Sequence, residues 1–251
     1  EVVYRLDRLG FPLIELSTLP DIHSPEQAKQ TAMKLGEIMR ITGKVKRGLG
    51  TIRQDINISV PGGARVELKG VQELDLIDEY VRREMQRQNA LVQIKAELVK
   101  EGLSHEKIMS QAGMDITGLL KKSTSKMIQT ALQKGNVIHA VRLPFMHGKM
   151  GKEVQPGRRI GSEVSSYVKA RAGLQGLLHG DEQLSNYGIT DEDIKTIREV
   201  LHAQPNDSFA IVMGDAKKAE MAIDVIKHRV AQLLKGVPGE TRNALEGGNS
   251  E

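Results

Sequence analysis

Hydrophobic and polar residues alternate most regularly between residues 48 and 70, and this stretch predicts a β-hairpin. Along its first arm the apolar side chains of Ile56, Ile58 and Val60 point one way, while the polar side chains between them point the other way. A period of two is typical of a strand with one buried face. The second arm, residues 64–69, repeats the pattern.

The register of the hairpin follows from its two alternating arms. Directly opposed residues share a face of a sheet, so apolar residues must oppose apolar residues. A loop of residues 61–63 meets this condition because it sets Ile58 against Val66. Such a loop normally closes with a residue in the left-handed region, and we expect Gly63 to supply it.

The same register gathers polar side chains on the other face of the hairpin. Asp55 comes to lie by Lys69 and Asn57 by Glu67, with Arg53 on the same side of the first arm. This face is either the wet side of an antiparallel sheet or a ligand-binding surface that holds a phosphate and a metal ion. The alternation is compatible with both.

A strand and a helix are expected before the hairpin. Residues 11–16 are mostly apolar and predict a strand, in which Glu15 is either at an exposed edge or a functional carboxylate. Ser24 as N-cap, Pro25 at the first helical position and Gln27 at the third predict a helix start.

A long helix is expected after the hairpin, because apolar residues recur at helical spacing from about residue 73 to residue 101. Its polar positions include Arg82, Arg83 and Arg87, and we expect them to form a solvated face. Two shorter helical patterns between residues 103 and 135 have the character of a connector.

The second half of the chain alternates strands with helices. Strands are expected at residues 137–143, 174–178 and 209–213, and helices at 162–172, from Thr190, and at 216–235. Such alternation predicts a compact two-layer α/β domain, and the whole chain is therefore of the α+β class. No phosphate-binding loop, dinucleotide fingerprint, nucleophile elbow or HExxH motif occurs in the sequence.

Composition and charge narrow the classes of function. The sequence has no cysteine, which excludes disulfides and thiolate chemistry, and 3% aromatic residues argue against base stacking. Residues 42–69 hold six basic and two acidic side chains, a local excess equal to the +4 of the whole chain. Within it, Lys44, Lys46 and Arg47 suit a phosphate-rich partner, and a solvated loop is the alternative.

Several longer segments of the sequence resemble those of a known family. The segments FPLIELSTLPDIHSPEQA, GLGTIRQDINISV and GGARVELKGVQELD resemble the cradle domain of the B and E subunits of tRNA-dependent amidotransferases. The segments LPFMHGK, GKEVQPGRRIGSEVSSYVKARAG and LLHGDEQLSNYGIT resemble the small inserted domain shared with bacterial aspartyl-tRNA synthetase. Because B subunits lack the insert, the combination resembles the archaeal E subunits that act on glutamyl-tRNA(Gln).

The resemblance implies a division of the chain. Residues 1–102 would be the C-terminal part of a partial, kinase-like cradle domain, with an antiparallel sheet and a long helix. Residues 103–135 would be a helical connector, residues 136–240 the inserted domain, and residues 241–251 a linker to C-terminal domains. The chain then reads as an excised fragment that holds part of the site and is expected to be inactive alone.

The resemblance also implies a reaction. In this family a ligase uses ATP and magnesium to phosphorylate the γ-carboxyl of glutamate carried by tRNA(Gln). Ammonia from a partner, the asparaginase-like D subunit of the amidotransferase, then displaces the phosphate. The location implied is cytoplasmic, and no apolar run in the sequence approaches the roughly 20 residues of a membrane span.

Two hypotheses for the site follow. The first places Arg53, Asp55, Asn57 and Lys69 in the phosphoryl-transfer cavity, where the cations neutralise phosphate oxygens. In this hypothesis Asp55 also helps to hold magnesium, and Glu15 joins it there.

The second hypothesis treats the region as a tRNA-binding and docking scaffold, with the chemistry in a preceding segment. Lys44, Lys46 and Arg47 would then contact backbone phosphates. A third reading takes the inserted domain as an idle family insertion or an assembly surface.

Overall fold

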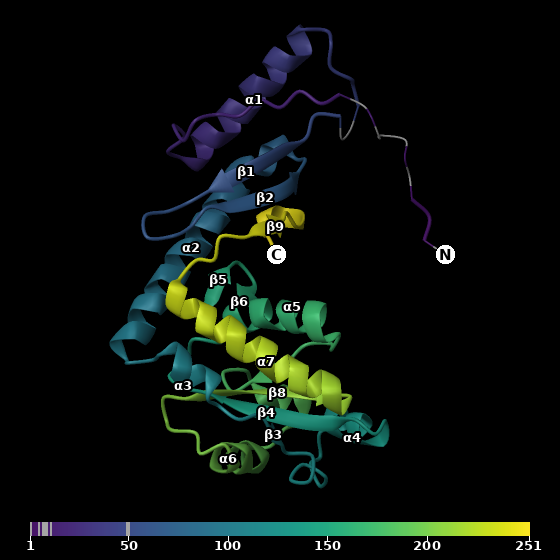
Figure 1. Cartoon of the computed structure of the whole chain (residues 1–251), viewed down its shortest axis with the longest axis vertical. Helices are drawn as coiled ribbons and strands as arrows, with labels where there is room; N and C mark the ends of the chain where they lie inside the picture. The colour runs from purple at the N-terminus through teal and green to yellow at the C-terminus, as the bar shows by residue number, and fades with distance from the viewer. Residues whose placement is uncertain (1, 5, 7–9, 11, 49–50) are drawn as a thin grey trace.

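The computed structural model describes residues 2–4, 6, 10, 12–48 and 51–251, and the described chain is an elongated α+β molecule (Figure 1). Helix α1 lies at one end, a small sheet follows, and the second half of the chain forms the other end. The long helix α2 (Ile77–Lys100) runs from the small sheet into the second half. No helix in the described ranges has the length and apolarity needed to cross a membrane.

The predicted hairpin forms with the predicted register. Strands β1 (Gln54–Ile58) and β2 (Val66–Val71) are antiparallel, and Ile56 opposes Leu68 while Ile58 opposes Val66. The buried faces of these strands confirm the alternation, since Ile58, Val66 and Leu68 are all buried. Hydrophobic patterning therefore determined which side chains face the core.

Two details of the hairpin differ from the prediction. The left-handed residue of the turn is Gly62, with φ +76°, and not Gly63. The register also shifts between Gln54 and Ile56, where Gly70 at φ +77° inserts an extra residue into β2. This bulge brings Val71 onto the buried face. Under strict alternation, Val71 would lie on the polar face.

Helix α1 (Pro25–Ile41) starts where the sequence predicts. The hydroxyl of Ser24 accepts a hydrogen bond from the backbone N–H of Gln27 at 3.1 Å. The Gln27 side chain in turn accepts the N–H of His23 at 2.8 Å. These bonds satisfy donors that a helix start otherwise leaves unpaired.

The strand predicted at residues 11–16 is wrong. Residues 12–19 have no strand pairing and are exposed, with Leu13 at 79% and Ile14 at 81% exposure; Phe11 lies outside the described residues. A strand requires a neighbour for its backbone hydrogen bonds, and the described part of the chain places none beside this segment.

The second half contains the remaining elements. In chain order these are α3 (His105–Met109), β3 (Met114–Asp115), α4 (Lys126–Gln133), β4 (Val137–Leu143), β5 (Glu153–Gln155), β6 (Arg158–Arg159), α5 (Ile160–Ala172), β7 (Leu178–His179), α6 (Asp191–Val200), β8 (Ser208–Gly214), α7 (Ala216–Gln232) and β9 (Thr241–Asn243). Short 3-10 turns occur at Leu74–Leu76, Leu184–Tyr187, Leu233–Lys235 and Glu246–Gly248. The strand expected at residues 174–178 is wrong at residues 174–177, because β7 begins only at Leu178.

An antiparallel sheet of order β3-β4-β8-β7 organises this half. Val141 and Val212 on one face pack in the core that includes α5 and α7. Ile138 and Ile211 on the other face pack with residues of α4 and α6. Helices therefore cover both faces of the sheet, one layer more than the alternation of elements suggested (Figure 1).

One hydrophobic core joins the two halves of the chain. It includes Leu68 of β2, Leu91 of α2, Val164 of α5 and Ile226 of α7, all at most 1% exposed. The segment expected to be a linker also returns to the hairpin, where β9 pairs in parallel with β2. Removing the second half would therefore expose the buried face of α2.

Candidate functional site

The polar face of the hairpin is the candidate site, and two of its predicted members are in direct contact. The ammonium of Lys69 lies 3.0 Å from Oδ2 of Asp55 on β1 and 3.2 Å from Oε1 of Glu67 on β2. The side chains of Lys69 and Asp55 are 48% and 44% exposed. A ligand in solution can therefore reach the pair.

The contacts around Lys69 reinforce its positive charge. The hydrogen bonds to Asp55 and then to Glu67 raise the pKa of Lys69 above its ordinary value, since both carboxylates favour the charged ammonium. Lys69 is therefore a cation at neutral pH. Such a side chain can bind phosphate oxygens but cannot act as a general base.

The other predicted members do not join this contact. Asn57 is opposite Glu67 in the register, and Arg53 directly precedes β1; both are exposed, and neither side chain has a hydrogen bond or ion pair among the described residues. Glu15 is exposed in the extended segment 12–19 and makes no described side-chain contact with the hairpin. The structure thus brings together Asp55 and Lys69 alone among the predicted residues that it describes.

The described residues do not by themselves fit a magnesium ion. Within that part of the chain, no three His, Cys, Asp or Glu side chains come close enough to hold a metal. Asp55 is already paired with Lys69, and no hydrogen bond or ion pair joins it to Glu15 among the described residues. Magnesium usually requires one or two carboxylates together with substrate phosphates, so these residues alone support no step through the metal.

The predicted nucleic-acid-binding residues lie in the loop between α1 and β1. Lys44, Lys46 and Arg47 are exposed there. The backbone N–H of Lys44 donates to the hydroxyl of Thr42 at 3.2 Å, which anchors the start of this loop to the end of α1. The three cations are close in sequence to the polar face but belong to a separate element.

A buried cluster of charges was not predicted from the sequence. The carboxylate of Glu163 on α5 accepts hydrogen bonds from Arg87 of α2 at 2.5 Å, Arg229 of α7 at 3.0 Å and Arg242 of β9 at 3.1 Å. Glu240 joins Arg87 and Arg242 at 2.6 and 3.0 Å. These five residues are called the buried charge cluster below.

The expectation that Arg87 is solvated is therefore wrong, since its side chain is 0% exposed. A signal for this was present in the sequence: Arg87 stands four residues before Leu91 and seven before Ile94, on the stripe of α2 that faces the core. Its partners Glu163 and Glu240 are 76 and 153 residues away along the chain, so no local pattern reveals the pairing.

The electrostatics of the cluster favour its charged state. Burial alone would raise the pKa of Glu163, but the adjacent Arg87 and Arg242 outweigh burial and lower this pKa to about 2. Glu163 is consequently an anion across the physiological range. The neighbouring Glu84 behaves in the opposite way: burial raises its pKa, and its Oε2 has no hydrogen-bond partner among the described residues.

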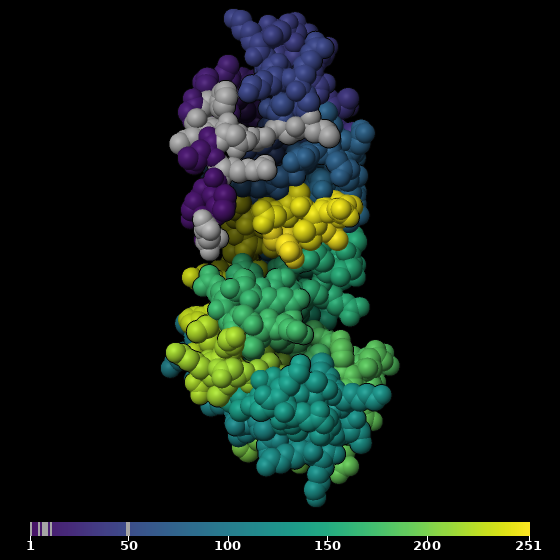
Figure 2. Space-filling model, turned by 90° about the vertical axis from the view of Figure 1, so that its right-hand side faces the viewer, coloured from purple at the N-terminus to yellow at the C-terminus, as the bar shows by residue number. Residues whose placement is uncertain are grey.

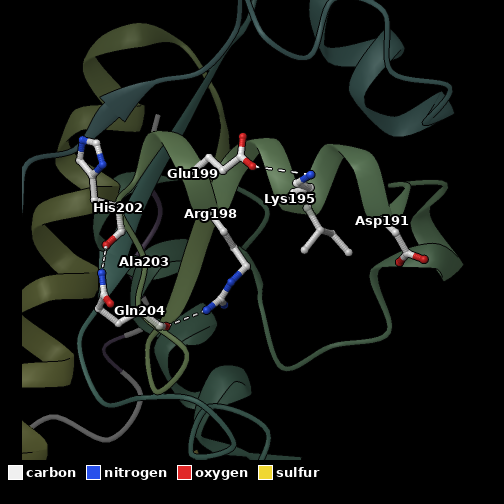
Figure 3. Close-up of a pocket in the computed structure, with 8 residues that line it drawn as sticks. Asp191, Lys195, Arg198, Glu199, His202, Ala203 and Gln204 are labelled. Atoms are coloured by element: carbon white, nitrogen blue, oxygen red, sulfur yellow. Dashed lines mark hydrogen bonds and ion pairs between the residues drawn. The ribbon is translucent and has the colours of Figure 1, made fainter.

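A concave region lies on α6, away from the hairpin, with a volume of about 470 Å³ (Figure 3). Its charged groups serve local structure. Arg198 donates to the backbone carbonyls of Gln204 at 2.7 Å and Asp207 at 3.1 Å, and Lys195 lies 3.9 Å from Glu199. This hollow therefore carries no converging set of free side chains among its lining residues.

Comparisons with known proteins show which family the chain resembles. A family model described as GatB/GatE catalytic domain matches residues 1–175, and a GAD domain model matches residues 128–223. Proteins named as the E subunit of glutamyl-tRNA(Gln) amidotransferase are similar over 100% of this chain: 48% identical in Saccharolobus solfataricus, 46% in Sulfolobus acidocaldarius and 45% in Sulfurisphaera tokodaii. The chain spans 40% of the length of these relatives. The resemblance predicted from the sequence motifs is confirmed.

Proposed function

Because this chain belongs to the GatB/GatE catalytic-domain family, we propose that it forms part of a protein that converts Glu-tRNA(Gln) to Gln-tRNA(Gln) with ATP. The whole protein would act as a carbon-nitrogen ligase in the cytoplasm. Its partner would be an asparaginase-like amidase, the D subunit of the amidotransferase, which supplies ammonia. The second substrate would be tRNA(Gln) carrying glutamate.

The reaction explains why a cationic face is needed. A carboxylate is a poor acyl donor until one of its oxygens becomes part of a leaving group. The γ-carboxylate oxygen would attack the γ-phosphorus of ATP, ADP would leave, and ammonia would then attack the acyl carbon and release phosphate. Transfer of a phosphoryl group depends on positioning and on cations placed against its oxygens.

The observation that carries the proposal is the exposed Asp55–Lys69 pair on the polar face. Lys69 would bind an oxygen of the transferring phosphoryl group, with Arg53 as a second cation, while Asp55 holds the ammonium in place. Asn57 would donate or accept a hydrogen bond beside them. Magnesium would accompany ATP in this proposal, and Asp55 and Glu15 are not assigned to it, because the described residues gather no metal-binding set.

The Lys69→Met variant of the full enzyme complex tests the proposal. We expect ATP γ-phosphate transfer to fall about 100-fold, because one cation facing the phosphoryl group is lost. Lys195→Met is the matched control, since Lys195 also lies beside a carboxylate and is 77% exposed. Equal transfer by Lys69→Met and the control would show that the polar face is not catalytic.

A second candidate function is a tRNA-binding scaffold, and the observation that favours it is the exposed loop of Lys44, Lys46 and Arg47. Replacing all three by glutamine is expected to reduce the salt dependence of tRNA binding. The slope of log K against log salt concentration is negative, and each lost phosphate contact reduces its magnitude by about 0.7 to 0.9. Filter binding of tRNA at several salt concentrations measures the slope, and an unchanged slope would exclude these contacts.

A further inference from the structure

Strand β9 extends the polar face beyond the hairpin. It pairs in parallel with β2, so that Thr241 stands opposite Glu67 and Asn243 opposite Lys69. The backbone N–H of Glu67 donates to the carbonyl of Glu240 at 3.0 Å. The segment therefore belongs to the same three-stranded sheet, of order β1-β2-β9.

The side chains of β9 alternate between the two faces of this sheet. Arg242 points inward and is 4% exposed, whereas Thr241 and Asn243 are exposed. In the register they share the face of Glu67 and Lys69. The polar face is consequently three strands wide, with Lys69 on the central strand.

Thr241 makes a direct contact with this face. Its hydroxyl donates to Oε2 of Glu67 at 3.1 Å, while Oε1 of the same carboxylate lies 3.2 Å from the ammonium of Lys69. Each oxygen of the Glu67 carboxylate thus has its own partner. Removing the hydroxyl would free the carboxylate to rotate away from Lys69.

Backbone hydrogen bonds hold Asn243 in place, and its side chain is exposed on the polar face. Its N–H donates to the carbonyl of Glu251 at 2.6 Å, and its carbonyl accepts the Glu251 N–H at 3.0 Å. Its side-chain amide makes no hydrogen bond or ion pair among the described residues. An exposed amide on a fixed backbone beside a cation offers both a donor and an acceptor to a ligand.

The buried charge cluster holds β9 in this position. The Arg242 guanidinium donates to Glu163 of α5 at 3.1 Å and to the carbonyl of Ser250 at 2.8 Å. Figure 2 shows the C-terminal segment filling the space between the hairpin half and the second half of the molecule. The second half thereby fixes the third strand of the candidate site.

We infer that Asn243 is a further substrate-contacting residue and that Thr241 is a positioning residue, together forming the third strand of the phosphoryl-transfer face. This inference rests on the proposed function. The Asn243 amide donates to an oxygen of the phosphoryl group or glutamyl carboxylate that Lys69 binds. Thr241 acts through Glu67, which keeps the Lys69 ammonium on the face.

The test uses the full enzyme complex with ATP and Glu-tRNA(Gln). We expect Asn243→Ala to lower kcat for γ-phosphate transfer about tenfold, as expected for one lost donor at a partly exposed site, with an unchanged thermal midpoint. Thr241→Val is expected to lower kcat about threefold, and Thr241→Ser to restore it. Asn186→Ala is the matched control, because Asn186 is exposed and lies on the turn before α6, away from the hairpin.

The outcomes separate this inference from the proposed function. If Lys69→Met lowers kcat while Asn243→Ala stays close to the unmodified complex, the third-strand role of Asn243 is overturned and the proposed function stands. If neither variant lowers kcat, both are overturned. A loss in Thr241→Val that Thr241→Ser does not restore overturns the positioning role, because the hydroxyl is then not the cause.

Discussion

Replacing Glu163 with glutamine is expected to lower the free energy of unfolding by about 3 to 5 kcal/mol, the usual cost of removing one charged partner from a buried ion pair. Glu163 is 3% exposed and accepts hydrogen bonds from Arg87, Arg229 and Arg242. Glutamine keeps the shape of the side chain but leaves three buried guanidinium groups with less opposing charge. The arginines cannot reach water without opening the core.

Urea denaturation of this chain measures the effect. Glu199→Gln is the matched control, because Glu199 is 66% exposed and lies 3.9 Å from Lys195. An exposed pair of this kind contributes at most about 1 kcal/mol. A loss below about 1 kcal/mol in Glu163→Gln would contradict the role of Glu163 in holding Arg87, Arg229 and Arg242 together.

The lowered pKa of Glu163 predicts how the stability of the chain depends on pH. The pKa of Glu163 is lowered in the folded state to about 2 from an ordinary value of 4.5. Its contribution is therefore fully present above pH 4.5 and is lost as the pH falls toward 2. Between pH 4.5 and 2, Glu163→Gln should consequently lose less stability than the unmodified chain. If the two curves of stability against pH are parallel, Glu163 is not the cause of the pH dependence.

Local patterns predicted those parts of the fold that local physics determines. The hairpin register followed from the period of two, and the start of α1 from Ser24 and Gln27, because the partners in both cases are close along the chain. Asp55 and Lys69 could be paired from the sequence for the same reason.

Long-range pairing accounts for what the sequence did not reveal. Strand β9 has three residues, too few for a periodic signal, and it is recognisable only beside β2, far away along the chain. Arg87 has a polar side chain whose burial depends on partners in the second half. The predicted strand at residues 11–16 illustrates the reverse error, since a mostly apolar run does not form a strand without a neighbour.

Replacing Asp55 with asparagine is expected to lower ATP γ-phosphate transfer by the full complex about 100-fold, within the range for removing a group that organises transition-state charge. Asp55 holds the Lys69 ammonium at 3.0 Å. Asparagine retains the size of the side chain but removes the charge that keeps the ammonium in place. Asp224→Asn is the matched control, since Asp224 is exposed and lies 2.9 Å from Lys227.

The most direct test of the central claim measures turnover and tRNA binding on one sample of the full complex carrying Asp55→Asn. If the polar face of the hairpin performs the chemistry, Gln-tRNA formation collapses while the Kd for tRNA stays close to its original value. If turnover survives, or falls only in proportion to tRNA binding, the hairpin is a scaffold and the claim is contradicted.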